Sequence, residues 1–299
     1  MPYDKIMPAY AHIVVIFNPK STGDSARRAQ DFAEEAGTLL PDANIHLERT
    51  QHAGHAEVLA YNAARRYNNV LLVSVSGDGG YNEVVNGALR AHFADGAALP
   101  ACALIPSGNA NDHHTRVYTR PLLAALKDGA EQCLDVIEIT AGDTIRYAHS
   151  YVSLGLSAHI AHELQKQRPS RLREITLGLQ VMRRFRSFTI NYRGKRRSFV
   201  NFVVGNIDLM GKYFHLSKGG TPHDGMLELW AVPAASKWRM IVHILRSLIS
   251  GTPSPAQTKG IRFTTIKPLT FQYDGEVGRI PARTEVTITC LHRVLRTVC

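Results

Sequence analysis

A glycine-rich turn around one acid is the first part of the chain whose residues are suited to chemistry. A β-like run, Val70 to Ser76, stops at Gly77-Asp78-Gly79-Gly80, and a helix-like run from Tyr81 to Arg90 follows directly. Backbone N–H groups converge where a strand turns into a helix, and the helix dipole adds positive potential, so such a turn binds anions. The Asp78 carboxylate within it indicates metal-phosphate chemistry. The turn therefore predicts a nucleotide-phosphate site.

The same turn has a simpler explanation, because Gly and Asp favour tight strand-to-helix connections for backbone reasons alone. Three glycines around one acid, followed by Asn82-Glu83, weaken this explanation without excluding it. The sequence contains no GxxxxGK[ST] loop and no GxGxxG loop, so the two commonest nucleotide folds have little support.

Two further polar turns follow β-like runs. Asn18-Pro19-Lys20-Ser21-Thr22-Gly23 comes after His12 to Phe17, and Pro106-Ser107-Gly108-Asn109-Ala110-Asn111-Asp112 comes after Ala101 to Ile105. Parallel sheets bind ligands beyond the carboxyl ends of their strands, so three such turns are expected to meet at one edge of a sheet. This convergence is a stronger signal than any one of the motifs.

The elements that must position these turns divide the chain in two. Alternating strands and helices predict an α/β domain with a doubly wound parallel sheet over residues 1–134, the nucleotide-binding domain. Beyond it, β-like runs separated by turn residues predict a mainly antiparallel β-sandwich over residues 135–290. The last segment, about residues 291–299, is a candidate to return to the first domain. Two segments interrupt the sandwich: 157–186, helical or mixed, and 236–250, which has the pattern of an amphipathic helix.

Bulk composition narrows the class of partner. The chain has 299 residues, a net charge of +10 and a sequence pI near 9.6, so anionic partners are favoured. Four cysteines without CxxC spacing indicate reduced thiols in a cytosolic protein. The first residues lack the apolar core of a signal peptide, and no apolar run approaches the roughly 20 residues of a membrane span. Any membrane contact is therefore expected to be peripheral.

A basic segment could make that contact. From Gln165 to Arg197 there are 11 Lys or Arg residues against one acid, Glu174. A solvated face is the usual place for such a run. Apolar residues are interleaved with the cations, however, and a helix of that kind can lie on an anionic bilayer, where each cation adds about 1 kcal/mol. No RNA- or DNA-binding motif is present, so no nucleic-acid partner is expected.

The three turns and later motifs resemble the diacylglycerol kinase catalytic family, which includes bacterial lipid kinases and the sphingosine and ceramide kinases. The order and rough spacing of the motifs hold over about residues 12 to 298. The matching segments are Asn18-Pro19-Lys20-Ser21, Gly77-Asp78-Gly79, Asn82-Glu83-Val84-Val85-Asn86-Gly87, Pro106-Ser107-Gly108, Asn111-Asp112, Arg116, Gly205-Asn206, Gly219-Gly220, Asp224-Gly225-Met226-Leu227 and Asp274-Gly275-Glu276.

The resemblance implies transfer of the γ-phosphate of ATP, with Mg²⁺, to the hydroxyl of diacylglycerol or a related lipid. It makes Asp274 the general base, Glu276 its partner and Asp78 a third catalytic acid, although on sequence alone either Asp274 or Glu276 could be the base. Asp78 and Asp224 would hold the metal. The implied nucleotide-binding residues are Asn18, Lys20, Ser21, Gly77, Asp78, Gly79, Gly80, Asn82, Glu83, Ser107, Gly108, Asn109, Asn111 and Asp112.

The resemblance also makes residues 135–290 the lipid-substrate domain. It implies a cytoplasmic protein that works at the anionic inner face of the membrane, and it admits a homodimer. Two alternatives stay open. NAD kinases share a Gly-Gly-Asp-Gly turn, but their Asn-Glu pair lies well downstream, whereas Asn82-Glu83 follows the turn directly. The second alternative is a relative that binds nucleotide or lipid without turnover.

The chain departs from the family pattern at several positions of the turns. Ser76 replaces the first glycine of the signature, Gly80 replaces its threonine, and Asn109 replaces the threonine of the third turn. In the family both threonines are placed to donate hydroxyl hydrogen bonds to phosphates, so phosphate binding is expected to be altered here. His113 and His114 replace a hydrophobic pair and are expected at the surface, with extra phosphate contacts as the alternative.

Overall fold

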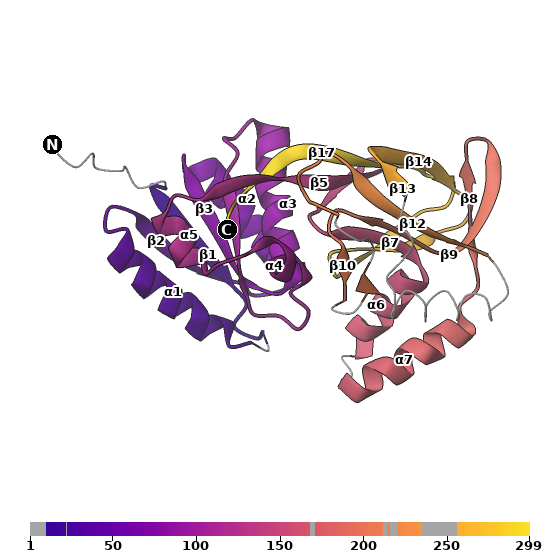
Figure 1. Cartoon of the computed structure of the whole chain (residues 1–299), viewed down its shortest axis with the longest axis horizontal. Helices are drawn as coiled ribbons and strands as arrows, with labels where there is room; N and C mark the ends of the chain where they lie inside the picture. Colours follow the sequence, from indigo (N-terminus) through magenta and orange to yellow (C-terminus); the bar gives the residue numbers. More distant parts are fainter. Residues whose placement is uncertain (1–9, 22, 168–170, 212–213, 216–219, 235–255) are drawn as a thin grey trace. The chain divides into compact units, whose positions relative to one another are not determined.

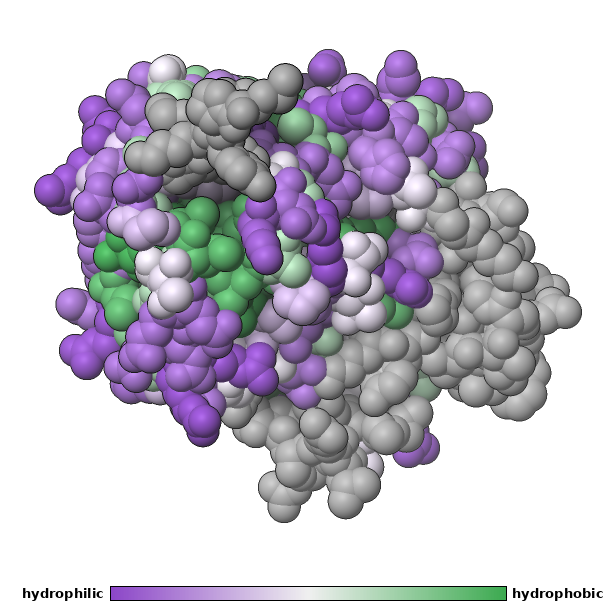
Figure 2. Space-filling view, turned by 60° about the vertical axis from the view of Figure 1, so that its left-hand side comes forward, coloured by the Kyte–Doolittle hydropathy of each residue, from purple (hydrophilic) through white to green (hydrophobic). Residues whose placement is uncertain are grey.

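The computed structural model divides the chain into two compact units, Met1–Leu134 with Arg293–Cys299, and Asp135–His292 (Figure 1). It describes residues 10–21, 23–167, 171–211, 214–215, 220–234 and 256–299. No helix in these ranges is long and apolar enough to cross a membrane. The face drawn in Figure 2 is mostly hydrophilic, and hydrophobic residues gather in one area of it.

The first unit contains a parallel sheet in the order β2-β1-β3-β4, and the end of β17 pairs in parallel with β4. The strands are β1 (His12–Phe17), β2 (Asn44–Arg49), β3 (Val70–Ser76), β4 (Ala101–Pro106) and β17 (Glu285–Val298). The helices are α1 (Ser25–Leu39), α2 (His55–Arg66), α3 (Asp78–Asp95), α4 (Asp112–Val117) and α5 (Leu122–Lys127).

Helices cover both faces of this sheet, as expected for a doubly wound domain (Figure 1). Alternate residues of the strands, such as Ile13, Leu71 and Val73, pack with Phe32 of α1 and Leu126 of α5. The strand residues between them point to the opposite face because side chains alternate along a strand. The strand order reverses at β1, so the turns after β1 and β3 flank the point where doubly wound sheets bind ligands.

Helices α2 and α3 pack unusually closely, and Gly87 is the reason. A Cβ built on Gly87 would lie 2.3 Å from the Glu57 carbonyl oxygen and 2.9 Å from the Ala60 Cβ, both in α2. The glycine therefore lets the backbones of the two helices approach each other, and this contact fixes the direction in which α3 leaves the Gly77 turn.

The second unit is mainly antiparallel, with β16-β15-β7-β9-β8-β14-β17 as its main strand order, β12 beside β9 and β6 beside β5. Strands from both ends of this order contribute to one hydrophobic core, which confirms the expected sandwich. The strands not yet given are β5 (Glu131–Ala141), β6 (Thr144–Ala148), β7 (Tyr151–Gly155), β8 (Phe188–Tyr192), β9 (Lys195–Gly205), β10 (Leu209–Met210), β11 (Phe214–His215), β12 (Leu227–Pro233), β13 (Ala256–Thr258), β14 (Gly260–Thr265), β15 (Leu269–Tyr273) and β16 (Glu276–Ile280). The helices are α6 (Leu156–Gln167) and α7 (Arg171–Arg184).

The prediction of a parallel α/β domain followed by an antiparallel domain is confirmed, with local differences. The run from Arg146 to Leu154 forms two strands, β6 and β7, instead of one. Helix α3 begins at Asp78 and not at Tyr81, so most of the glycine turn is the first turn of the helix. The expected helix over residues 236–250 lies outside the described residues.

Gly87→Ala is expected to lower the free energy of unfolding by about 2 kcal/mol, because the methyl group would overlap α2 backbone. Gly37→Ala in α1 is the matched control, since its nearest neighbour, Ile45 Cδ1, is at an ordinary 3.7 Å. The control should gain on the order of 0.5 kcal/mol from helix propensity. Urea unfolding of both variants checks this, and equal effects would contradict the close packing.

Candidate functional site

The three polar turns of the first unit touch one another, as expected. The Ser21 hydroxyl donates to the Ser107 carbonyl oxygen at 2.7 Å, and the Ser107 N–H donates to the Ser76 carbonyl oxygen at 2.8 Å. Gly77 and Gly108 meet backbone to backbone: a Cβ on Gly108 would lie 2.3 Å from Gly77 Cα. Residues from three loops therefore surround one small region at the carboxyl edge of the sheet.

Helix α3 directs its first turn at this region. Gly77 is the N-cap, with extended backbone (φ −90°, ψ −173°), and the first N–H that bonds back within the helix is that of Tyr81, which donates to the Gly77 carbonyl oxygen at 3.1 Å. The N–H groups of a first helical turn have no carbonyl partner within the helix and carry the positive end of its dipole. Asp78, Gly79 and Gly80 therefore form the first helical turn, whose N–H groups face this region.

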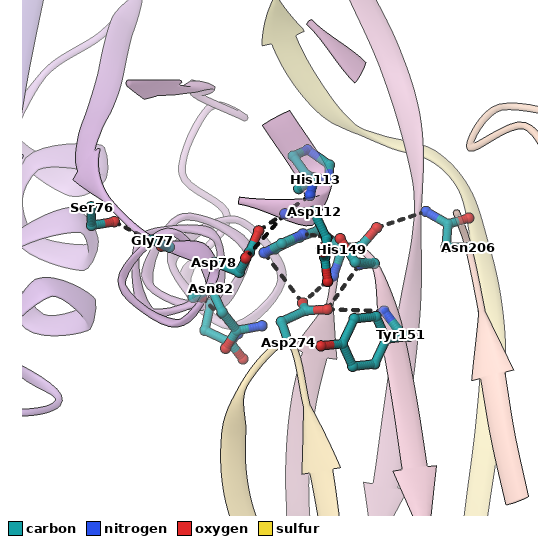
Figure 3. A network of polar contacts seen from close by, with 12 residues as sticks. Ser76, Gly77, Asp78, Asn82, Asp112, His113, His149, Tyr151, Asn206 and Asp274 are labelled. Carbon is teal, nitrogen blue, oxygen red and sulfur yellow. Dashed lines mark hydrogen bonds and ion pairs between the residues drawn. The ribbon is translucent and has the colours of Figure 1, made fainter. Parts of the chain in front are cut away.

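Asp78 connects the second turn to the third. Its two carboxylate oxygens accept hydrogen bonds from the backbone N–H groups of Asp112 and His113, each at 3.2 Å, at the start of α4 (Figure 3). A carboxylate oxygen has more than one acceptor site, so this arrangement still suits a metal ion. Asp78 holds the loop geometry whatever else it binds.

Two asparagines of the motifs are occupied in shaping their own loops. Asn111 adopts a left-handed backbone (φ 56°), and its side chain accepts from Gly108 N–H at 3.0 Å and donates to the Gly108 carbonyl oxygen at 3.1 Å. The Asn18 side chain accepts from Lys20 N–H at 2.9 Å. Both residues lie at the site, but the geometry gives them the role of holding backbone N–H groups in place.

Glu83 and Asn82 also have structural partners. The Glu83 carboxylate accepts from the N–H groups of Gly54 at 2.8 Å and Ala56 at 3.1 Å, which caps the N-terminus of α2. Asn82 is buried and accepts from the Asn86 side chain at 3.0 Å. The sequence signal for nucleotide binding at Asn82-Glu83 therefore coincides with residues that fasten α3 to its surroundings.

Ser107 has a buried hydroxyl for which the described part of the chain provides no hydrogen-bond partner. The residue is 3% exposed and lies where all three turns meet. Burying a hydroxyl without a partner costs free energy, so the Ser107 hydroxyl is a candidate for contact with a ligand or a bound water.

The expectation that His113 lies at the surface is wrong. His113 is fully buried, and its ring packs at a centroid distance of 5.2 Å on Tyr81 of α3 and against the edge of Tyr118. The imidazole takes the place of a hydrophobic side chain in the core. His114 is partly buried and stacks on Tyr118 at 4.9 Å, and burial lowers its pKa.

In the second unit, Asp274-Gly275 forms the two-residue turn of a hairpin. Both residues have positive φ, 47° and 92°, and Tyr273 pairs with Glu276 across the turn. The Asp274 carboxylate accepts from the N–H groups of His149 at 2.6 Å, Ser150 at 3.0 Å and Tyr151 at 2.9 Å (Figure 3). These bonds hold the break between β6 and β7, which explains why one predicted strand is two.

Asp224 lies in an exposed turn before β12, where its carboxylate accepts from Met226 N–H at 2.9 Å. Asp135, which the sequence reasoning missed, is fully buried beside it and accepts from Gly225 N–H at 2.6 Å and from His292 Nδ1 at 2.8 Å. The signal in the sequence that could have pointed to Asp135 is its position at the boundary between the two units. No group of three or more His, Cys, Asp or Glu side chains within the described ranges could hold a metal ion. Mg²⁺ needs only one or two carboxylates beside water and phosphate, so exposed Asp224 fits that role.

Comparison with known proteins identifies the part of the chain that contains the three polar turns. Residues 12–143 match the family model of the diacylglycerol kinase catalytic domain. These residues belong to that family. The motif resemblance is thereby confirmed for these residues, and the three turns described above lie among them.

The chain is also similar to individual lipid kinases, over most of its length or over about half of it. A protein of Xanthomonas euvesicatoria named YegS-like lipid kinase is 26% identical over 286 residues, 90% of this chain and 90% of that protein. Sphingosine kinase 1 of Arabidopsis thaliana is 31% identical over 169 residues, 52% of this chain and 34% of that protein. A crystal structure of a diacylglycerol kinase from Bacillus anthracis, 18% identical, superposes with a TM-score of 0.68 and covers 97% of both chains, which shows a shared fold.

Asp274→Asn is expected to lower the stability of the second unit by about 3 kcal/mol, because an amide N–H would face one of the three backbone N–H donors. Asp143→Asn is the control, since Asp143 is an exposed residue of the β5–β6 turn in the same unit. Thermal unfolding compares the two. A fully stable Asp274→Asn protein would show that these bonds are dispensable.

Glu228 provides a prediction about pH. Burial, together with the nearby carboxylates of Asp224 and Asp208, raises the pKa of Glu228 from 4.5 to about 7. The folded state therefore binds more protons than the unfolded state between these values, and stability should fall as pH rises through this window. The measurement is urea unfolding with a metal chelator present, so that no divalent ion binds the nearby carboxylates. The free energy of unfolding of Glu228→Gln, relative to that of the wild type, should increase as the pH is raised to about 8. A gain that does not change with pH would contradict the raised pKa.

Proposed function

We propose that this protein is an ATP-dependent lipid kinase that transfers the γ-phosphate to a lipid hydroxyl such as that of diacylglycerol. The observation that best supports this proposal is that three glycine-containing turns meet at the carboxyl edge of the sheet. The first turn of α3 is directed at them. Phosphoryl transfer depends on positioning and on charge stabilisation, and backbone N–H groups fixed by packed loops provide both.

Within the first unit, the residues proposed to contact phosphates are those whose polar groups are not used up by the loops. The N–H groups of Gly79 and Gly80 and the Ser107 hydroxyl surround the anion site, and Lys20 is exposed at the first turn. Asp78, and Asp224 in the second unit, are each proposed as a ligand of Mg²⁺, which would neutralise charge on the transferring phosphate. Asn18, Asn82, Glu83 and Asn111 are proposed to support these contacts through the backbone.

The general base is proposed to come from the Asp274-Gly275-Glu276 turn. Asp274 is fully enclosed, and three backbone N–H groups occupy its oxygens, whereas Glu276 is partly exposed at the start of β16. A base must reach the proton that it accepts. We therefore assign proton acceptance to Glu276 and the positioning of the hairpin to Asp274.

A cavity of about 420 Å³ in the second unit supports a lipid acceptor. Its lining combines apolar side chains, among them Phe188 and Leu269, with the cations Arg186, Arg196 and Lys267. Such a lining suits an acyl chain that lies next to an anionic headgroup or bilayer surface. Peripheral association with an anionic membrane on the cytoplasmic side is part of the proposal.

Incubation of the protein with Mg-ATP and a total lipid extract, followed by mass spectrometry, should show one lipid class gaining a phosphate. Ser107→Ala should bind Mg-ATP about tenfold more weakly without losing stability, because its hydroxyl makes no protein hydrogen bond in the described structure. Thr38→Ala, which removes an exposed hydroxyl of α1, is the control and should bind normally.

The alternatives give different results in the same assay. Phosphorylation of NAD and of no lipid would favour the NAD kinase-like reading. Binding of Mg-ATP without transfer to any lipid would favour a non-catalytic relative.

A further inference from the structure

We infer that Ser76 and Gly80 share a single side-chain space at the start of α3, and that the Ser76 hydroxyl is a phosphate-positioning group of this site. The inference rests on the proposed function for the nature of the ligand. These two residues are the two positions at which the Gly77 turn departs from the family signature. In the structure the two substitutions depend on each other.

The distances leave room for only one side chain. Ser76 is the last residue of β3, and Gly80 is the third residue of α3. A Cβ built on Gly80 would lie 2.6 Å from the Ser76 Oγ and 2.7 Å from the Ser76 Cβ. Real Cβ atoms essentially never approach so closely.

The Ser76 Cβ takes part in the overlap, so rotating the hydroxyl away does not relieve it. With this backbone, any side chain at position 76 requires glycine at position 80. The reverse follows from the same distance: a residue with a Cβ at position 80 requires glycine at position 76. A glycine followed by threonine and a serine followed by glycine are thus two ways to fill the same space with one hydroxyl-bearing side chain.

The Ser76 hydroxyl lies beside the first turn of α3 and has two hydrogen-bonding contacts. Its Oγ donates to the Gly77 carbonyl oxygen at 3.0 Å (Figure 3) and lies 2.7 Å from the Ser74 Oγ. A hydroxyl has one donor and two acceptor sites, so the Ser74 hydroxyl can donate to Ser76 while the Ser76 proton turns to a phosphate oxygen. The residue is buried, at 7% exposure, and directly precedes the N-cap of α3. The hydroxyl is therefore available, next to the first helical turn, for the phosphate contact that we infer.

A double-mutant cycle measured by thermal unfolding tests the shared space without any ligand. Gly80→Thr alone should lower the Tm by about 5 °C or more, since the new Cβ overlaps Ser76. Adding Ser76→Gly to it should restore the Tm to within about 2 °C of the wild type. A Gly80→Thr protein as stable as the wild type, or a double variant as unstable as the single, would overturn the shared space.

A binding experiment tests the hydroxyl. Ser76→Ala keeps the Cβ and removes only the oxygen, so by calorimetry it should bind Mg-ATP about tenfold more weakly and adenosine as the wild type does. The Ser76→Gly, Gly80→Thr double variant should regain the Mg-ATP affinity. Unchanged Mg-ATP affinity in Ser76→Ala would overturn the phosphate role alone. A wild-type protein that binds no Mg-ATP would overturn the proposed function and that role with it, while the thermal cycle would still decide the shared space.

Discussion

The backbone contact between Gly77 and Gly108 is the constraint on which the site depends. It brings the turn after β3 so close to the turn after β4 that a Cβ on Gly108 would lie 2.3 Å from Gly77 Cα, and a Cβ on Gly77 would lie 3.0 Å from Gly108 Cα. The Asp78 carboxylate reinforces the contact through the N–H groups of Asp112 and His113. Anion-binding N–H groups from separate loops can then face one region, which a single helix N-terminus would not achieve.

The parallel sheet explains why the motifs are spaced along the chain as they are. Each polar turn follows a strand of the parallel sheet, and neighbouring strands bring their carboxyl ends to one edge. This part of the site was predictable from the sequence, since strand runs and glycine turns are local signals. The sandwich was predictable for a similar reason: short β-like runs separated by turn residues recur along the second half.

The features of the structure that the sequence did not predict depend on contacts between residues that are distant in sequence. Nothing local to Glu83 shows that its carboxylate caps α2, and nothing local to His113 shows that it packs on Tyr81 in the core. The break between β6 and β7 has its cause 123 to 125 residues further on, in the Asp274 carboxylate. A local pattern reports which residues are polar, whereas a long-range hydrogen bond decides whether a polar group faces a ligand or the protein itself.

A motif match therefore identifies a site more reliably than it identifies ligand contacts. Asn111 and Glu83 match the family pattern, yet their polar atoms bond to the protein's own backbone. Ser76 departs from the pattern, yet it fills the space that a side chain at position 80 would need. Matches and departures have to be compared in space. Compared in that way, the serine and the glycine of this turn are one exchange within a single side-chain space and not two independent departures, because a Cβ at position 80 would overlap the Ser76 side chain.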